Sequence, residues 1–199
     1  MTALGLSAEP GQVERLLAYL DLLLKWGRVF NLTAIRDLDD MVVRHLLDSL
    51  AVRPLLGPGT LADVGTGAGL PGLPIALTEP ERAVTLIESS AKKQRFLHQV
   101  VAELGLLNVT LQAGRVESYH PSRPFATVIS RAFASIADFL ASAGHLVAPG
   151  GRILAMKGRH PGPELEALPP GFALAGVHRL SIPGLAAERH VVEIRTEAS

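Results

Sequence analysis

A short apolar run that passes directly into a series of glycines constrains this chain more than any other feature of its sequence. The run is Leu61-Ala-Asp-Val64, and the segment that follows reads Gly65-Thr-Gly-Ala-Gly-Leu-Pro-Gly72. Glycines at the end of a strand let the backbone turn sharply and let a ligand approach where any Cβ would clash. The helix expected next, over residues 70–77, would offer unpaired N–H groups to an anionic or carboxylate-bearing ligand. The segment therefore predicts a cofactor site.

Two registers of the glycine segment fit two different cofactors. Gly65, Gly67 and Gly69 form G-x-G-x-G, with Asp63 two residues before it, which is the arrangement of S-adenosylmethionine (SAM) methyltransferases. Counted instead from Gly67, the glycines form G-x-G-x-x-G, which is the dinucleotide fingerprint. Glu88 lies 21 residues after Gly67, at the expected end of the next strand. An acid there accepts hydrogen bonds from ribose hydroxyls, and both cofactors contain a ribose.

Three features favour SAM over a dinucleotide. The first register begins directly after Val64, where the strand is expected to end. In the second register, Pro71 restricts the backbone where the fingerprint expects ordinary helix. The chain also ends in two successive strands, which resemble the reversed last strand of a methyltransferase sheet. An NAD(P)-dependent oxidoreductase stays open as the alternative enzyme.

The order of the expected elements predicts an α/β fold with an N-terminal helical extension. Apolar residues recur at helical spacing over residues 10–29 and again from about residue 39 to residue 50. After residue 60, short strands alternate with helices, which is typical of βαβ units and a mostly parallel, Rossmann-like sheet. The expected strands cover residues 61–64, 83–87, 109–111, 125–129 and 152–156, and the expected helices cover 70–77, 91–104 and 135–146. Residues 172–182 and 189–195 predict a terminal hairpin with a reversed strand.

Length and composition exclude several classes of protein. With 199 residues the chain allows one domain and a modest extension, which we expect over residues 55–199 and 1–54 respectively. The 19 basic and 19 acidic residues balance, which argues against non-specific coating of nucleic acid but leaves a local basic patch possible. The absence of cysteine excludes disulfides, thiolate metal sites and a cysteine nucleophile. The histidines form no metal-binding motif, so no metal is expected.

The sequence also gives an expectation for location. The longest charge-free stretch, residues 64–78, has 15 residues and includes four glycines and two prolines, whereas a spanning helix needs about 20 apolar residues. The first ten residues contain no basic segment followed by an apolar one, as a secretory signal would. We therefore expect a soluble, cytoplasmic protein without a membrane partner.

Several unusual strings make the chain resemble one family over nearly its whole length. The sequence is similar to the bacterial 16S rRNA (guanine-N7) methyltransferases, also called glucose-inhibited division protein B. The strings that carry the resemblance are Lys25-Trp-Gly-Arg-Val-Phe-Asn-Leu-Thr-Ala-Ile-Arg36, Arg44-His-Leu-Leu-Asp-Ser49, the segment 63–72, Gly114-Arg-Val-Glu117, Ile129-Ser-Arg-Ala-Phe-Ala134, Met156-Lys-Gly158 and Glu188-Arg-His190. The resemblance implies a SAM-dependent enzyme that methylates one guanine of 16S rRNA in the small ribosomal subunit.

The resemblance also implies roles for individual residues. The SAM-binding residues expected from it and from the glycine register are Asp63, Gly65, Gly67, Leu70, Glu88, Val116, Glu117 and Arg131. Arg131 is expected beside the methyl group and is the candidate catalytic residue. Candidate RNA-binding residues around the carboxyl edge of the sheet are Arg36, Arg44, Arg115 and Lys157. His45 and Asp48 are expected to form a structural hydrogen-bonded pair.

The chemistry of guanine N7 agrees with the residues present. N7 has an in-plane lone pair and no proton at neutral pH, so methylation there needs positioning and desolvation but no general base. The sequence accordingly offers no catalytic dyad. Because the methylated guanine is cationic, Arg131 or Arg115 suits a hydrogen bond to guanine O6 or a phosphate. A non-enzymatic RNA-binding or ribosome-assembly module that keeps a cofactor fold is the third alternative.

Overall fold

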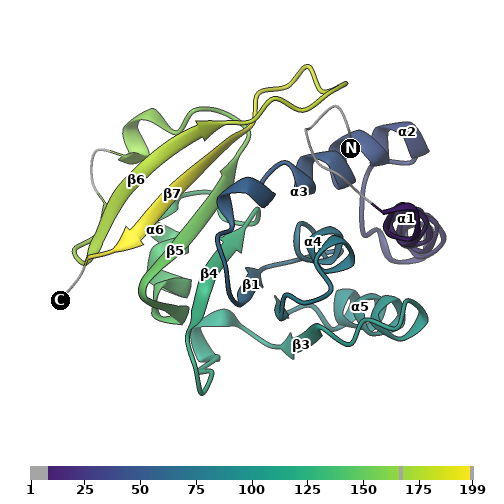
Figure 1. Cartoon of the computed structure of the whole chain (residues 1–199), viewed down its shortest axis with the longest axis horizontal. Helices are drawn as coiled ribbons and strands as arrows, with labels where there is room; N and C mark the ends of the chain where they lie inside the picture. The colour runs from purple at the N-terminus through teal and green to yellow at the C-terminus, as the bar shows by residue number, and fades with distance from the viewer. Residues whose placement is uncertain (1–8, 166–167, 198–199) are drawn as a thin grey trace.

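The computed structural model describes residues 9–165 and 168–197, and it contains a seven-stranded sheet in the order β3-β2-β1-β4-β5-β7-β6 (Figure 1). The five strands β1 to β5 run parallel, and β7 is antiparallel to both of its neighbours. The predicted reversed strand is therefore confirmed. The strands are β1 Leu61–Val64, β2 Val84–Glu88, β3 Val109–Ala113, β4 Phe125–Ser130, β5 Val147–Lys157, β6 Phe172–Arg179 and β7 His190–Thr196.

Helices cover both faces of the sheet, because successive side chains of each strand point to opposite sides. Leu61 packs into one core with helices α1, α4 and α5, whereas Ala62 and Val64 pack into a second core with α6 (Figure 1). The α-helices are α1 Pro10–Phe30, α2 Leu38–Met41, α3 Asp48–Leu50, α4 Gly72–Thr78, α5 Ala91–Glu103 and α6 Ile136–Ala143. A π-helical turn, η2, covers Val42–Leu47, and short 3₁₀ turns cover Arg53–Leu55, Val116–Ser118, Gly144–Leu146 and Gly162–Leu165.

The N-terminal helices share the core of the sheet. Leu16, Leu20 and Leu23 of α1 belong to the same buried cluster as Leu73 of α4 and Phe96 of α5. The Tyr19 hydroxyl of α1 donates a hydrogen bond of 2.8 Å to the carbonyl of Ala68, inside the glycine segment. Burial raises the pKa of Tyr19, so the hydroxyl keeps its proton. The extension therefore contacts the predicted cofactor loop directly.

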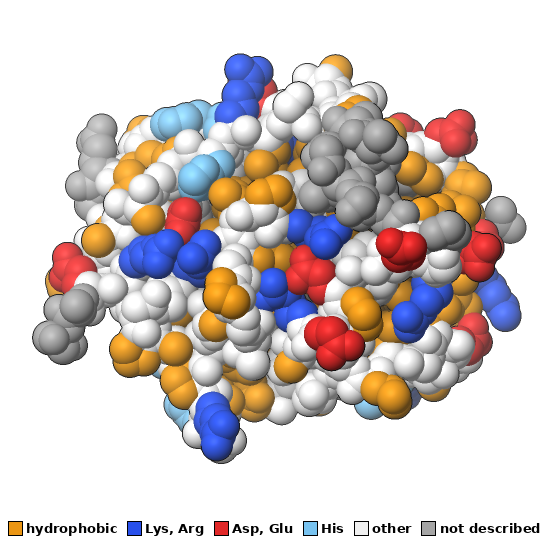
Figure 2. Space-filling model, viewed as in Figure 1, with side chains coloured by type: hydrophobic (Ala, Val, Ile, Leu, Met, Phe, Trp, Pro, Cys, Tyr) orange, Lys and Arg blue, Asp and Glu red, His pale blue; other side chains and the backbone are white. Residues whose placement is uncertain are grey.

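Charges of both signs are mixed over the face of the molecule seen in Figure 2. Basic and acidic side chains alternate there with hydrophobic ones, and neither sign gathers into one large patch. Among the described residues, no helix is both long and apolar enough to cross a membrane. The first eight residues, on which the expectation about secretion depends, lie outside the described part.

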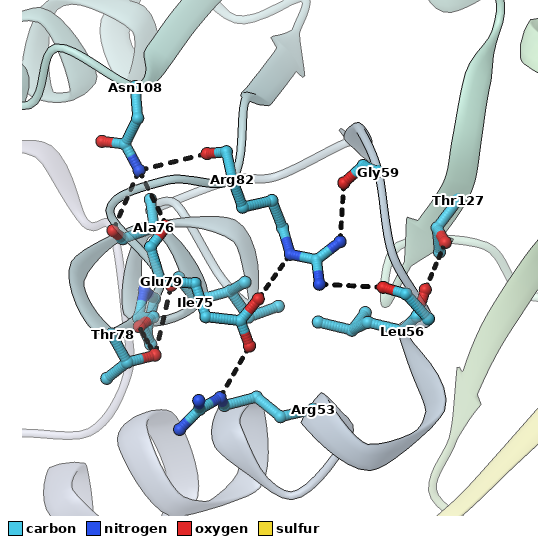
Figure 3. Close-up of polar contacts among 12 residues, drawn as sticks. Arg53, Leu56, Gly59, Ile75, Ala76, Thr78, Glu79, Arg82, Asn108 and Thr127 are labelled. Atoms are coloured by element: carbon cyan, nitrogen blue, oxygen red, sulfur yellow. Dashed lines mark hydrogen bonds and ion pairs between the residues drawn. The ribbon is translucent and has the colours of Figure 1, made fainter.

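A partly buried carboxylate, Glu79, holds together the end of the sheet at which the strands begin (Figure 3). Glu79 accepts hydrogen bonds from Arg53 at 2.8 Å and from Arg82 at 2.5 Å. Arg82 also donates to the carbonyl of Gly59, just before β1. This cluster therefore joins the end of the N-terminal extension to the loops that enter β1 and β2.

Candidate SAM site

A pocket opens at the carboxyl ends of the parallel strands, which is where open α/β sheets bind their ligands. It has a volume of about 160 Å³ and lies between the segments that follow β1, β2, β3 and β4. Its lining residues are Val64, Gly65, Ile87, Ser89, Gly114, Arg115, Val116, Glu117, Ala132 and Phe133. The walls combine apolar side chains with exposed backbone, so they suit a flat ring such as adenine.

The glycine segment forms the floor of this site in conformations that other residues rarely adopt. Gly65 and Gly67 have φ angles of +65° and +63°. A Cβ added to Gly65 would come within 2.7 Å of the Ala132 Cβ, so a side chain there would fill the cradle between the β1 and β4 loops. The role of these glycines in cofactor binding stays a prediction.

Glu88 connects the glycine segment to the following helix. Its side chain is 5% exposed, and its two carboxylate oxygens accept hydrogen bonds from Gly67 N at 2.9 Å and Ser90 N at 2.8 Å. The Lys93 ammonium lies 3.8 Å from the same carboxylate. Each oxygen retains a further lone pair, so the group can still accept a ribose hydroxyl. Glu88 is therefore suited both to fix the loop and to bind the cofactor.

Asp63 is completely buried beneath the loop. Its Oδ2 accepts hydrogen bonds from Thr66 Oγ1 at 2.5 Å and Gly72 N at 2.8 Å, and its Oδ1 has no partner among the described residues. Burial raises the pKa of Asp63 to about 6, against the opposing effect of these two hydrogen bonds. The carboxylate therefore ties the start of α4 to the end of β1.

The raised pKa of Asp63 predicts a pH-dependent contribution to stability. Because its folded pKa of about 6 lies above the unfolded value of 3.8, this contribution is fully present below pH 3.8 and lost as the pH rises toward 6. The loss is roughly 3 kcal/mol, at about 1.4 kcal/mol per pKa unit. Urea unfolding of the wild type and Asp63→Asn should show the stability difference changing between about pH 4 and pH 6 and constant above. A difference that is flat across this range would contradict the assignment.

Arg131 follows β4 and points toward the N-terminal extension. Its Nη1 lies 3.2 Å from Asp48 Oδ2, and its side chain is 27% exposed. Burial and the neighbouring Arg131 cation both lower the pKa of His45, which keeps that imidazole neutral. His45 Nε2 instead shares a hydrogen bond of 2.9 Å with Thr33 Oγ1. The expected pairing of His45 with Asp48 is therefore wrong, because the carboxylate is taken by arginines.

The four candidate RNA-binding residues differ in the exposure of their side chains and in whether they contact an acidic group. Arg36 and Arg115 are exposed, and Arg115 lines the pocket. Arg44 is also exposed, although its Nε lies 3.6 Å from Asp40. The Lys157 side chain is 11% exposed, and its ammonium donates to the carbonyl of Ala134 at 2.7 Å and to Glu164 at 3.0 Å. Lys157 therefore fastens the loop after β5 to the loop after β4.

The structure brings together some of the predicted SAM-binding residues and separates others. Gly65, Val116 and Glu117 line the pocket, and Glu88 and Gly67 are hydrogen-bonded to each other beside it. Asp63, Leu70 and Arg131 do not line the pocket. Asp63 is buried beneath the glycine segment, and Leu70 packs against the core. Arg131 directly precedes the lining residues Ala132 and Phe133. Sequence reasoning missed Ser89, Gly114, Ala132 and Phe133. Their common signal is position, because each lies within a few residues of the end of a parallel strand.

Among residues 9–165 and 168–197, no group of three or more acidic or histidine side chains could hold a metal ion.

A family model described as rRNA small subunit methyltransferase G matches residues 12–192, which include the N-terminal helices, the pocket and most of the hairpin. The chain belongs to the rRNA small subunit methyltransferase G family. This membership confirms the resemblance on which the sequence analysis relied.

Named members of the rRNA small subunit methyltransferase G family align with almost the whole chain. The protein named ribosomal RNA small subunit methyltransferase G of Nitrosococcus oceani is 49% identical over 192 residues, covering 96% of this chain and 90% of its own. The protein of that name from Aromatoleum aromaticum is 51% identical over 197 residues, covering 96% of this chain and 93% of its own.

Two solved structures have folds similar to that of this chain. The glycopeptide N-methyltransferase MtfA, crystallised with SAM, is 15% identical with a TM-score of 0.63, over 77% of this chain and 88% of that one. TrmN from Thermus thermophilus is 22% identical with a TM-score of 0.61, over 75% of this chain and 48% of that one. These likenesses agree with the predicted SAM-dependent methyltransferase fold.

Proposed function

We propose that this protein transfers a methyl group from SAM to N7 of one guanine in the 16S rRNA of the small ribosomal subunit. The observation that carries the proposal is the family match over residues 12–192, because it extends through the N-terminal helices as well as the sheet. The proposal includes action in the cytoplasm, where the ribosome is found. The same family membership argues against the oxidoreductase alternative.

We assign SAM binding to the pocket and the glycine segment. The adenine would lie against Val116 and the backbone of Gly114 and Glu117, in the part of the site with apolar walls. The ribose hydroxyls would bind to Glu88, whose carboxylate lies at the mouth of the loop. Gly65 would let the cofactor approach the backbone, since a Cβ there would fill the space beside Ala132. Asp63 would act from beneath by holding the loop in shape.

The residues around the site suit N7 chemistry. SAM, when bound, supplies an electrophilic methyl group on a positively charged sulfur. Guanine N7 has a free lone pair, so the protein needs to align the two reactants and exclude water, without removing a proton. Arg131 would orient the guanine through its O6 or a neighbouring phosphate, and the exposed Arg36, Arg44 and Arg115 would bind the surrounding RNA backbone. Lys157, whose ammonium is bound to Ala134 and Glu164, would instead hold the loop after β4 in place.

The proposal is tested with methyl-labelled SAM and small ribosomal subunits that lack the modification. Aniline cleaves RNA at 7-methylguanine, so strand scission maps the modified position to one nucleotide. Label and scission at a single guanine of the 16S rRNA are the expected result. SAM binding without any transfer would instead support an assembly module that keeps the cofactor fold, and absent SAM binding would revive the dinucleotide register.

Arg131→Ala should reduce methyl transfer more than RNA binding. The guanidinium fork can make two hydrogen bonds to the guanine or its phosphate, whereas the many other RNA contacts are independent of it. We expect kcat to fall about tenfold and the affinity for subunits to change less than about threefold, equivalent to roughly 1.4 and 0.6 kcal/mol. Single-turnover transfer and filter binding measure the two quantities. Equal losses in both would contradict the placement of Arg131 beside the reacting guanine.

A further inference from the structure

Three carboxylates among the described residues, Asp48, Glu79 and Glu193, each contact two arginines. Glu79 contacts Arg53 and Arg82 where the strands begin, and its side chain is 20% exposed. Asp48 lies near the carboxyl ends of the strands and is 1% exposed, with Oδ1 accepting from Arg189 Nε at 2.8 Å and Oδ2 lying 3.2 Å from Arg131 Nη1. Of these clusters, only that of Asp48 includes a residue of the proposed active site.

Asp48 and Arg131 form an ion pair inside a cluster that also contains Arg189. The Asp48 side chain is 1% exposed, and its Oδ2 and Arg131 Nη1 have no hydrogen-bond partner among the described residues, so the 3.2 Å contact between them is ionic. A buried charge without a partner of opposite sign is strongly unfavourable, so Arg131 and Arg189 together make the burial of Asp48 favourable. Asp48 lies on α3 and Arg131 follows β4, so this pair connects the helical extension to the loop after β4.

Arg131 is partly buried and lies close to several polar residues beneath the site. Its cation acts on the pKa of Asp63 under the glycine segment, of Tyr19 on α1 and of His45 on η2. Of these, Tyr19 keeps its proton and His45 stays neutral. Asp63 is committed to Thr66 and Gly72, so Asp48 is the carboxylate that directly faces the Arg131 guanidinium.

The reaction gives this pairing a consequence beyond stability. SAM carries a positive charge on sulfur before transfer, and 7-methylguanine carries one after transfer. A guanidinium without a carboxylate beside it would repel both cations, and this repulsion is stronger at a partly buried position than in bulk water. Asp48 offsets part of the positive charge of the two arginines that share it, while the protein keeps the hydrogen-bonding fork of Arg131.

We propose that Asp48 is a positioning residue that fixes the Arg131 guanidinium at the methyl-transfer site and offsets part of its positive charge, so that the site tolerates a cationic cofactor and a cationic product. This inference rests on the role proposed for Arg131. It also assigns the N-terminal extension a part in the reaction, because the carboxylate is supplied by α3 and its partner by the sheet domain.

Binding of SAM and of its neutral demethylated product, S-adenosylhomocysteine, tests the proposal without using activity. Calorimetry on Asp48→Asn should show SAM affinity about tenfold lower and S-adenosylhomocysteine affinity within about twofold of the wild type, because only SAM meets the uncompensated cation. Adding Arg131→Gln to Asp48→Asn should restore the wild-type ratio of the two affinities, since the cation is then gone. Asp48→Glu, which keeps the carboxylate, should retain more SAM affinity than Asp48→Asn.

Glu79→Gln is the control, because it removes the charge of a carboxylate that also contacts two arginines but lies at the opposite end of the sheet. It should lower the thermal midpoint and leave both affinities unchanged. Equal losses of SAM and S-adenosylhomocysteine affinity in Asp48→Asn would overturn the proposal and leave Asp48 as a structural tie. The proposal would also be overturned if adding Arg131→Gln to Asp48→Asn failed to restore the wild-type ratio of the two affinities. The same holds if Asp48→Asn and Asp48→Glu lose SAM affinity equally. A wild type that binds SAM but never labels the subunits would count against the proposed rRNA substrate alone, since these comparisons are of binding.

Discussion

Replacing Glu88 with alanine should weaken SAM binding by about 100-fold. The carboxylate is the acceptor for Gly67 N and Ser90 N, so its removal leaves two donors without their partner and frees the glycine segment from α5. A hydrogen bond to a charged group contributes about 1.5–3 kcal/mol, and 2.7 kcal/mol corresponds to a factor of about 100. The proposed loss of the ribose contact acts in the same direction. Calorimetric titration with SAM measures the effect.

Glu81→Ala is the control for Glu88→Ala, because Glu81 is exposed and lies before β2, at the opposite end of the strand from Glu88. It should bind SAM like the wild type. If Glu88→Ala retains wild-type affinity, the SAM pocket is not at the end of β2.

Gly72→Ala should destabilise the protein by about 3–5 kcal/mol. A Cβ at this position would overlap Leu86 Cδ2 and come within 2.8 Å of Asp63 Oδ2 and 3.1 Å of Asp63 Cβ. Overpacking of a buried site costs about 1–3 kcal/mol, and displacing the Gly72 N–H from a buried carboxylate costs about 1.5–3 kcal/mol more. Urea unfolding gives the free-energy change, and the midpoint should fall with the slope unchanged.

Gly162→Ala separates this steric effect from the general effect of adding a methyl group. A Cβ there has no described atom within 4 Å. We expect its free energy of unfolding to stay within about 0.5 kcal/mol of the wild type. A Gly72→Ala protein as stable as this control would show that α4 can move away from β1 without cost.

The alternation of strands and helices was readable in the sequence because it depends on local patterns. Strands β1, β2 and β4 begin and end within one residue of expectation, since each is a short apolar run with clear breakers. Strand β5 begins at Val147, five residues earlier than predicted, and continues through Pro149 and Gly150. Those two residues predict a turn, but pairing of Val147 with Phe125 on β4 holds the segment in the sheet. At Pro149 and Gly150, pairing with β4 therefore outweighed the turn preference of the local sequence.

The sequence predicted only part of the candidate site, because only residues at a fixed spacing along the chain form a recognisable pattern. The glycine segment and Glu88 have a fixed spacing along the chain, so the sequence indicated their proximity, and Gly67 and Glu88 are hydrogen-bonded. The partners of Asp48 have no such signal, since Arg131 and Arg189 come from distant segments. His45 was the plausible partner on sequence distance alone, yet it bonds to Thr33. The division into residues 1–54 and 55–199 stays a prediction, although both parts contribute to one buried core.

The contact between Asp48 and Arg189 joins residues 141 positions apart, and this separation determines when a newly made chain can work. Ribosomes synthesise about 5–20 residues per second, so Asp48 emerges roughly ten seconds before its last partner exists. During that interval the carboxylate lacks the Arg189 contact that helps to make its burial favourable, although apolar residues such as Leu50 of α3 can already pack into the core. The Asp48 cluster is therefore expected to be completed late, after the segment that precedes β7 has been made. A protein that modifies ribosomes would thus complete this cluster only once Arg189 has been synthesised.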